Sequence, residues 1–257
     1  MQTKTIAKIK KMFTNNELTK QDIESLREDG RKGVQNLLRI YDRKKKHQLE
    51  LKNQFNKMWT FENTLSEKGF QFIAGVDEAG RGPLAGPVVA AAVILPRNFN
   101  LIGVTDSKQL SEEKRNYYFQ KITEEAQSYA IASVSNERID EVNIYQATIE
   151  AMRQAVMKLT IQPDFTLLDA IEIEELPMQT KSLIKGDERS VSIAAASILA
   201  KVSRDRTMRE IAYRYPEYGF EKHMGYGTKY HLQQLKAYGL TPYHRKSFSP
   251  VRKLLLS

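Results

Sequence analysis

Cysteine is absent from this 257-residue chain, which excludes both a disulfide framework and a thiolate metal site. No apolar run approaches the roughly 18 residues that a membrane span requires. The first residues carry charge without the apolar core of a signal peptide, so we expect a cytoplasmic protein with no membrane partner. The hydrophobic content of 41% is that of an ordinary globular protein, and the length suits one large domain with an extension.

Positive charge is abundant, and it is unevenly distributed. The net charge is +9. Residues 1–68 hold 16 Lys and Arg against 9 Asp and Glu, residues 69–218 hold 17 against 21, and residues 219–257 hold 7 against 1. Basic ends around an acidic centre fit an enzyme that grips phosphates at its flanks and binds cations at its centre. A merely solvated surface is the competing interpretation for any single lysine cluster.

The first part of the chain, residues 1–68, lacks strand-like apolar runs, and its patterns predict a basic helical extension. Helices are expected after Asn15 and from Val34 to about Trp59. The second helix carries the basic block 43–47, which is either a nucleic-acid contact or a solvated face. Residues 59–69 are expected to form a linker into the main domain.

From Phe70 onwards the pattern changes to strands alternating with helices, which predicts an α/β fold over residues 69–257: a mixed sheet flanked by helices. Strands are expected at 70–77, 86–95, 129–134 and 165–169, and helices at 111–126, 139–159, 190–213 and 228–238. The short separation of the first two strands favours an antiparallel hairpin. The last part, about 219–257, is expected to be helical and basic.

Four carboxylates stand out by their context. Asp77 and Glu78 end the first strand, Asp169 ends a short apolar strand, and Asp187 lies just before a helix start. If they converge at one edge of the sheet, they need a cation to share the site, and oxygen-only ligands favour Mg²⁺ or Mn²⁺. Taken singly, Asp169 could be a turn residue and Asp187 a helix N-cap.

Asp77, Glu78 and Asp187 occur within a set of five ordered segments that resemble ribonuclease HII of the bacterial type. The segments are Asp77-Glu-Ala-Gly-Arg-Gly-Pro-Leu-Ala-Gly-Pro87, Asp106-Ser-Lys-Gln-Leu-Ser111, the block 186–205, residues 215–231 and His244-Arg-Lys-Ser-Phe-Ser-Pro250. They span about residues 70–251 in the expected order. Residues 1–68 resemble the N-terminal extension of some bacterial members.

The resemblance implies a ribonuclease H-like fold and an endonuclease that hydrolyses RNA in RNA/DNA hybrids. It also implies nicking on the 5′ side of single ribonucleotides in duplex DNA, with 3′-hydroxyl and 5′-phosphate products. Such an enzyme serves ribonucleotide removal and RNA primer processing. Asp77, Glu78, Asp169 and Asp187 match the catalytic, metal-binding carboxylates, which would hold two divalent ions, Mg²⁺ or Mn²⁺.

Substrate-binding residues also follow from the resemblance. The backbone of Gly80, Arg81 and Gly82 matches the segment that recognises the ribose, whose 2′-hydroxyl both donates and accepts hydrogen bonds. Tyr226 is the candidate aromatic side chain that stacks beneath the next sugar, with Tyr218 as the alternative. Ser190 and Lys201 are candidate phosphate contacts, although Ser190 equally suits a helix start.

Three other identities compete with this one. The sister family, ribonuclease HIII, also has an extension, but its opening motif resembles Asp-Glu-Val-Gly-Thr-Gly, whereas this chain has Ala79 and Arg81. A non-catalytic nucleic-acid-binding module would have lost a carboxylate. A junction resolvase or integrase would have no use for a ribose-sensing Gly-Arg-Gly segment. We therefore expect an endoribonuclease that acts as a monomer.

Overall fold

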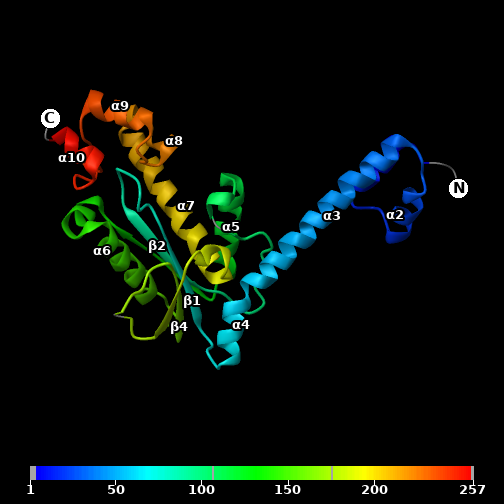
Figure 1. The fold of residues 1–257 in the computed structure, drawn as a ribbon, viewed down its shortest axis with the longest axis horizontal. Helices are drawn as coiled ribbons and strands as arrows, with labels where there is room; N and C mark the ends of the chain where they lie inside the picture. Colours follow the sequence, from blue (N-terminus) through cyan, green and yellow to red (C-terminus); the bar gives the residue numbers. More distant parts are fainter. Residues whose placement is uncertain (1–3, 106, 175, 256–257) are drawn as a thin grey trace. The chain divides into compact units, whose positions relative to one another are not determined.

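The computed structural model describes residues 4–105, 107–174 and 176–255. The chain divides into two compact units, Met1–Gln54 and Phe55–Ser257. Each unit has a hydrophobic core of its own. Figure 1 shows the helices of the first unit and the layered sheet of the second.

The N-terminal unit is helical, as expected. It contains α1 (Ile6–Thr14), α2 (Lys20–Arg27) and the first part of α3 (Lys32–Met58). The Thr19 side chain and the Asp22 side chain form a reciprocal capping box at the start of α2. The small core of the unit consists of Ile9, Ile23, Val34 and Leu38.

The expectation of a linker at residues 59–69 is wrong. Residues Thr60–Glu67 form the helix α4, in which Glu62 and Leu65 are buried. Leu65 packs in one apolar cluster with Ile73 and Phe165 of the sheet. The polar residues of this stretch suggested a loop, but tertiary packing of Leu65 and Phe61 decides in favour of a helix.

The expected mixed sheet is present, with five strands in the order β3-β2-β1-β4-β5. Its strands are β1 (Ile73–Ala79), β2 (Val88–Ile94), β3 (Ser128–Val134), β4 (Phe165–Asp169) and β5 (Gln179–Leu183). The expected hairpin is confirmed, because β1 and β2 pair antiparallel, whereas β4 is parallel to both β1 and β5. Strand β5 was not expected, because only Leu183 of this edge strand is buried and its residues show no apolar run.

Helices cover both faces of the sheet (Figure 1). On one face, α5 (Glu112–Glu125) and α7 (Val191–Arg214) pack on inward residues of β2 such as Ala91 and Val93. On the other face, α6 (Asn136–Met157) packs on β2 and β3. The small residues of α7 let it lie close to β1: a Cβ atom on Gly75 would meet the backbone of Ser192 at 2.1 Å.

The C-terminal part is helical and basic as expected. It contains α8 (Phe220–His223), α9 (Lys229–Tyr238) and α10 (Ser249–Leu255). Three short 3-10 turns complete the fold: η1 (Ser107–Gln109), η2 (Gly186–Glu188) and η3 (Pro216–Tyr218). Among the described residues, no helix is both long and apolar enough to span a membrane.

Candidate active site

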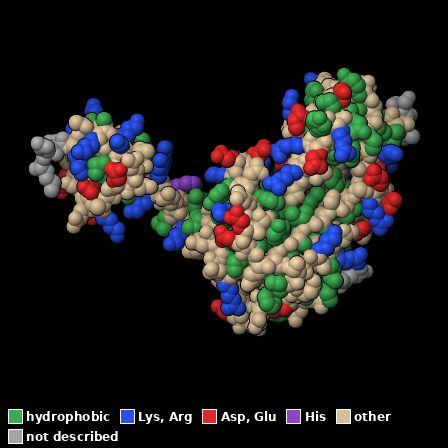
Figure 2. Space-filling model, turned by 180° about the vertical axis from the view of Figure 1, so that it is seen from behind, with side chains coloured by type: hydrophobic (Ala, Val, Ile, Leu, Met, Phe, Trp, Pro, Cys, Tyr) green, Lys and Arg blue, Asp and Glu red, His purple; other side chains and the backbone are tan. Residues whose placement is uncertain are grey.

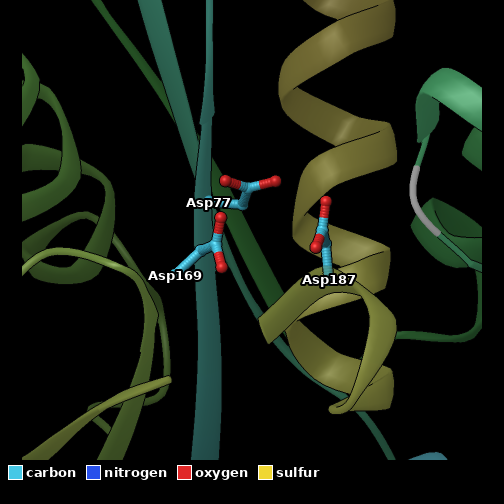
Figure 3. Close-up of side chains that lie close together, drawn as sticks. All are labelled: Asp77, Asp169 and Asp187. Carbon is cyan, nitrogen blue, oxygen red and sulfur yellow. The ribbon is translucent and has the colours of Figure 1, made fainter. Parts of the chain in front are cut away.

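Three of the predicted carboxylates converge at the ends of the central strands (Figure 3). Asp77 lies in β1 and Asp169 ends the parallel neighbour β4, whose register pairs Val76 with Leu168. Asp187 lies in η2, immediately before α7. One carboxylate oxygen from each of the three lies within 4.8 Å of the others. The arrangement therefore offers one cation an oxygen ligand from three separate elements.

The local structure around these three side chains holds them in place. The backbone N–H of Gly186 donates to Asp169 Oδ1 at 2.6 Å, which ties η2 to the end of β4. The N-cap of α7 is Ser190, so Asp187 does not have the capping role that its sequence context allowed. Its side chain is left to face the other two carboxylates (Figure 3).

Burial makes the charges at this site costly. Asp77 is only 4% exposed and Asp187 only 7%. Burial raises the pKa of Asp77 well above its usual range, and the charges of Glu78 and Asp169 raise it further. A hydrogen bond from the Ser197 hydroxyl opposes this shift. Like charges in a dry site are relieved by a divalent cation, and the donor set consists of oxygens alone, so the residues fit a hard metal ion.

Glu78, the fourth predicted carboxylate, is not one of these three, but its charge acts on Asp77 and that of Asp169 acts on it. Its Oε1 atom pairs with Nη1 of Arg81 at 3.4 Å. Its Oε2 atom is buried and has no hydrogen-bond partner among the described residues. Burial raises the pKa of Glu78, while the charge of Arg81 acts against this shift. A buried carboxylate oxygen without a partner is the kind of atom that a metal ion satisfies.

A cavity of about 410 Å³ lies beside this site. Its lining includes Glu78, the loop Gly80–Gly82, Lys201 and Tyr226. Further lining residues are Ala79, Ser107, Lys108, Arg115, Ser197 and Arg204. Five of the six predicted substrate-binding positions thus share one cavity with a predicted metal ligand.

Tyr226 and its alternative, Tyr218, are in different environments. Tyr226 is 47% exposed, and a Cβ atom on Gly82 would lie 3.4 Å from its ring carbon Cε1. Tyr218 is buried, stacks on Phe220 and donates its hydroxyl hydrogen to the Gly239 carbonyl at 2.5 Å. Only Tyr226 of the two lines the cavity.

The two predicted phosphate contacts also differ. Ser190 is completely buried, and its hydroxyl donates to Oε1 of Glu62 at 2.5 Å, so in this structure it caps α7 and is out of reach of a phosphate. Burial raises the pKa of Glu62. Lys201 lines the cavity, and its ammonium group donates to Asp205 Oδ1 at 2.7 Å.

Sequence reasoning missed several lining residues. Ser107, Lys108 and Arg115 come from the segment that follows Asp106, which itself lies outside the described residues. The signal was available, because Asp106-Ser-Lys-Gln-Leu-Ser111 is one of the five segments that carry the resemblance. Arg204 was missed because it stands on a helix whose other residues indicate packing.

Comparison with known proteins identifies the family. Residues 74–251 match the family model described as Ribonuclease HII, and residues 5–66 match the one described as Ribonuclease HII N-terminal domain. The chain belongs to the ribonuclease HII family. The ribonuclease HII match agrees with the Ala79 and Arg81 signature and excludes the sister family, ribonuclease HIII.

Relatives cover the whole chain. Ribonuclease HII of Oceanobacillus iheyensis is 51% identical over 253 residues, which are 98% of this chain and 97% of the relative. Ribonuclease HII of Ligilactobacillus salivarius is 50% identical over 256 residues, and 100% of each chain is covered. The ribonuclease H2 structure from Pyrococcus horikoshii OT3 is 29% identical, with a TM-score of 0.63, over 72% of this chain and 97% of that one.

The expected ribonuclease H-like fold and nuclease class are therefore confirmed. The chain is a ribonuclease HII enzyme that carries an acidic site for a divalent metal, formed by Asp77, Asp169 and Asp187.

Proposed function

We propose that this ribonuclease HII cuts RNA in RNA/DNA hybrids and nicks duplex DNA on the 5′ side of a single embedded ribonucleotide. The products carry a 3′-hydroxyl and a 5′-phosphate, which suits ribonucleotide removal and RNA primer processing by a monomeric enzyme. One observation carries this proposal: the loop Gly80–Gly82 follows the carboxylates of β1 directly and shares a cavity with Glu78. The groups proposed to cut the strand and those proposed to recognise the ribose are thus adjacent.

Asp77, Asp169 and Asp187, together with the unpartnered oxygen of Glu78, would hold two divalent ions, Mg²⁺ or Mn²⁺. Such ions supply activation of the attacking water and stabilisation of the charge on the leaving 3′ oxygen. The protein residues contribute placement: β1 and β4 are hydrogen-bonded neighbours, and the Gly186 amide restrains Asp169. This restraint favours one geometry for the carboxylates before substrate arrives.

Ribose recognition would use the backbone of the loop. The amides of Gly80, Arg81 and Gly82 donate no hydrogen bond within the part of the chain that the structure describes. They are therefore available to the 2′-hydroxyl of a ribonucleotide, the group that separates RNA from DNA at this position. Tyr226 beside Gly82 would stack under the following sugar.

Residues 1–68 are proposed to act as a nucleic-acid-binding extension and residues 69–257 as the catalytic domain. Support comes from the net charge of the extension and from its own family match over residues 5–66. Helix α4 belongs to the extension by sequence, but its buried residues lie in the core of the catalytic unit. Contact with substrate is therefore assigned to the part before residue 55.

A nicking assay tests the proposal. A DNA duplex with one ribonucleotide should be cut once, 5′ to that ribonucleotide, and only when Mg²⁺ or Mn²⁺ is added. An all-DNA duplex of the same sequence is the matched control and should stay intact. Equal cutting of the two duplexes would overturn the role of the ribose-facing loop, and cutting in the presence of a chelator would overturn the metal assignment.

A further inference from the structure

Two arginines beneath the substrate cavity are buried without a carboxylate partner. Arg204 of α7 is 1% exposed and Arg245 of the C-terminal part is 0% exposed. Neither forms a salt bridge with any residue that the structure describes. Buried charges are normally paired, because desolvation of an unpaired charge is costly. Both guanidinium groups instead donate to backbone carbonyl groups around the cavity.

Arg245 determines which way the Gly80–Gly82 loop faces. Its Nη2 atom donates to the Gly80 carbonyl at 2.6 Å and its Nη1 atom to the Arg81 carbonyl at 2.9 Å. In a planar trans peptide the carbonyl of one residue and the N–H of the next point in opposite directions. The amides of Arg81 and Gly82 are therefore directed away from Arg245, and they are the amides proposed to meet the ribose.

Arg204 joins this loop to the turn that carries Tyr226. Its Nε atom donates to the Pro87 carbonyl at 3.0 Å, and its Nη1 atom donates to the Met224 carbonyl at 3.0 Å. A third bond from Nη2 reaches the Ala85 carbonyl at 3.2 Å. One rigid guanidinium thus links the residues that follow the Gly80–Gly82 loop to the turn that carries Tyr226, although the two segments are far apart in sequence.

The loop and the turn are also in direct contact. The Leu84 amide donates to the Gly225 carbonyl at 2.8 Å. Arg204 approaches the loop so closely that a Cβ atom on Gly80 would lie 2.0 Å from its Nε atom. Since Gly80 also has a φ of +98°, no other residue suits this position. The glycine and the arginine form one packing unit.

Both arginines keep their charge at neutral pH. Burial lowers the pKa of Arg245 to about 9 and that of Arg204 to about 10. Two positive charges therefore lie under a cavity that is proposed to receive a polyanion.

We propose that Arg204 and Arg245 are positioning residues that set the distance and orientation between the ribose-facing amides and the Tyr226 ring. Through that geometry they determine how strongly cleavage depends on the 2′-hydroxyl. The inference rests on the proposed ribose recognition by Gly80–Gly82. It assigns the specificity of the enzyme to two buried side chains that act through the backbone carbonyl groups they bind.

Lysine substitutions test this inference, because they keep the charge and remove the planar fork. Arg204→Lys and Arg245→Lys are assayed on two duplexes, one with a 2′-hydroxyl and one with a 2′-fluoro group at the single ribonucleotide. The ratio of the two cleavage rates should fall about 10- to 100-fold in each variant, since misplacement by about 1 Å can cost about 100-fold. Arg206→Lys, on the exposed side of the same helix, is the matched control and should keep the wild-type ratio.

The ratio separates positioning from general damage. A purely structural loss lowers both rates equally, so an unchanged ratio in both lysine variants would overturn the inference. A wild-type enzyme whose ratio is near one would instead overturn the proposed ribose recognition itself. If neither variant folds, amide exchange in the wild-type enzyme decides: Leu84 and Gly86 should be protected as strongly as α7, and rapid exchange there would contradict a loop held by the arginines.

A second inference concerns the N-terminal unit and rests on its proposed role as a nucleic-acid-binding extension. A groove of about 650 Å³ is lined by residues of α1 and α3, and its charged residues are Lys10, Lys44 and Lys45, with no Asp or Glu among the described lining residues. Its aromatic side chains, Phe13 and Tyr41, lie with ring centroids 5.4 Å apart. Figure 2 shows Lys and Arg side chains gathered over this unit.

The lysines of the groove differ from other cations of the same unit. Salt bridges join Lys4 to Asp22, Arg27 to Asp42, Arg31 to Asp29 and Lys46 to Glu50. Within the described ranges, Lys10, Lys44 and Lys45 form no such pair, and the Lys45 ammonium lies over the Tyr41 ring at 5.8 Å. Unneutralised cations beside aromatic rings are typical of surfaces that bind a nucleic-acid strand.

We infer that this groove binds the phosphodiester backbone of a nucleic-acid strand.

The test compares two triple variants that remove equal charge from the same unit. Lys10→Gln/Lys44→Gln/Lys45→Gln should raise the Kd for a hybrid duplex and lower its salt slope by about 2 to 3, because each phosphate contact contributes about 0.9. The control, Lys8→Gln/Lys20→Gln/Lys32→Gln, changes exposed lysines outside the groove and should have a clearly smaller effect. If the two triple variants have equal effects, or if the first has no effect, the inference that this groove binds a nucleic-acid strand is overturned.

Discussion

The two units of the molecule use polar residues in opposite ways. In the catalytic unit, polar side chains such as Asp77, Arg204 and His244 are buried and hydrogen-bonded. In the N-terminal unit the charged side chains remain at the surface, where ion pairs such as Arg27 with Asp42 contribute little. From this difference we expect the catalytic unit to determine the geometry of the site, and therefore turnover and selectivity. We expect the N-terminal unit to contribute charge, and therefore affinity and salt dependence.

The largest effect is expected from Asp77→Asn. The substitution removes a ligand from the centre of the carboxylate group, so cleavage should fall by at least about 100-fold, the scale of losing one group that stabilises the transition state. Binding of a hybrid duplex should stay near the wild-type level. Stability should not fall, because the neutral amide relieves the repulsion that raises the pKa of Asp77. A cleavage assay measures turnover, and thermal unfolding measures stability. Near-normal turnover would contradict the metal assignment.

The second-largest effect is expected from two histidines of the catalytic unit, His231 and His244, which should make its stability depend on pH. The Thr241 amide can only donate, so it makes His244 Nδ1 an acceptor. Neutral His244 then donates from Nε2 to His231 Nε2, 3.0 Å away, and His231 Nδ1 donates to the Tyr226 carbonyl at 2.9 Å. The chain requires both rings to be neutral and ends at the turn that carries Tyr226.

Protonation of these histidine rings must therefore destabilise the folded state. Burial, together with the neighbouring His231, lowers the pKa of His244 from 6.5 to about 4. Between pH 6.5 and 4 the unfolded chain binds the extra proton, so stability falls as the pH falls through this window. The loss approaches about 3 kcal/mol, at 1.36 kcal/mol for each pKa unit. Trp59, the single tryptophan of the chain, packs against the core of the catalytic unit. Its fluorescence, monitored during unfolding at each pH, measures this loss of stability.

The N-terminal unit provides the contrast for this prediction. Hydrogen bonds from neighbouring residues lower the pKa values of the partly exposed Asp22, Asp29 and Asp42. The stability that these carboxylates contribute is therefore present above their ordinary pKa and is lost only at more acidic pH. His47→Gln, at an exposed position of α3, is the control and should leave the acid profile unchanged. A flat profile between pH 6.5 and 4 would contradict the neutral histidine chain.

Two glycine substitutions, one in each unit, are expected to have different effects. Gly80→Ala places a Cβ atom 2.0 Å from Arg204 Nε at a φ of +98° and should cost about 2 kcal/mol as well as ribose selectivity. Gly30→Ala, in the N-terminal unit, meets nothing within 4 Å and should be neutral or slightly stabilising. Urea unfolding and the hydroxyl-to-fluoro rate ratio measure the two effects. An unaffected Gly80→Ala enzyme would show that the loop tolerates movement.

The sequence predicted the strands that carry Asp77 and Asp169, because their apolar runs reflect local composition. It also predicted the carboxylate group, three members of which the structure brings together. It did not predict α4, β5 or the roles of Arg204 and Arg245. These depend on tertiary packing: α4 folds against the sheet, β5 needs β4, and a buried arginine in a helix has the same sequence signal as an exposed one.

The smallest effect is expected from removing residues 1–54. This deletion removes a net charge of +7 but leaves the buried residues Phe55, Met58 and Leu65 in place. Affinity for a hybrid duplex should fall about tenfold near physiological salt, with a shallower salt slope, because up to three phosphate contacts are lost. Turnover at saturating substrate should change little, since no residue of the candidate active site is removed.

The deletion of residues 1–68 sharpens the same comparison. It takes away α4 as well, and with it Leu65 from the sheet cluster and the Glu62 carboxylate that accepts from Ser190 and Ser192 beside Asp187. This longer deletion should therefore lower both stability and turnover, whereas the shorter one weakens only binding. Titration of binding against salt, paired with thermal unfolding of both truncated proteins, measures the difference. If the two deletions behave alike, α4 belongs with the extension in function, and the boundary between the units lies near residue 68 instead of 54.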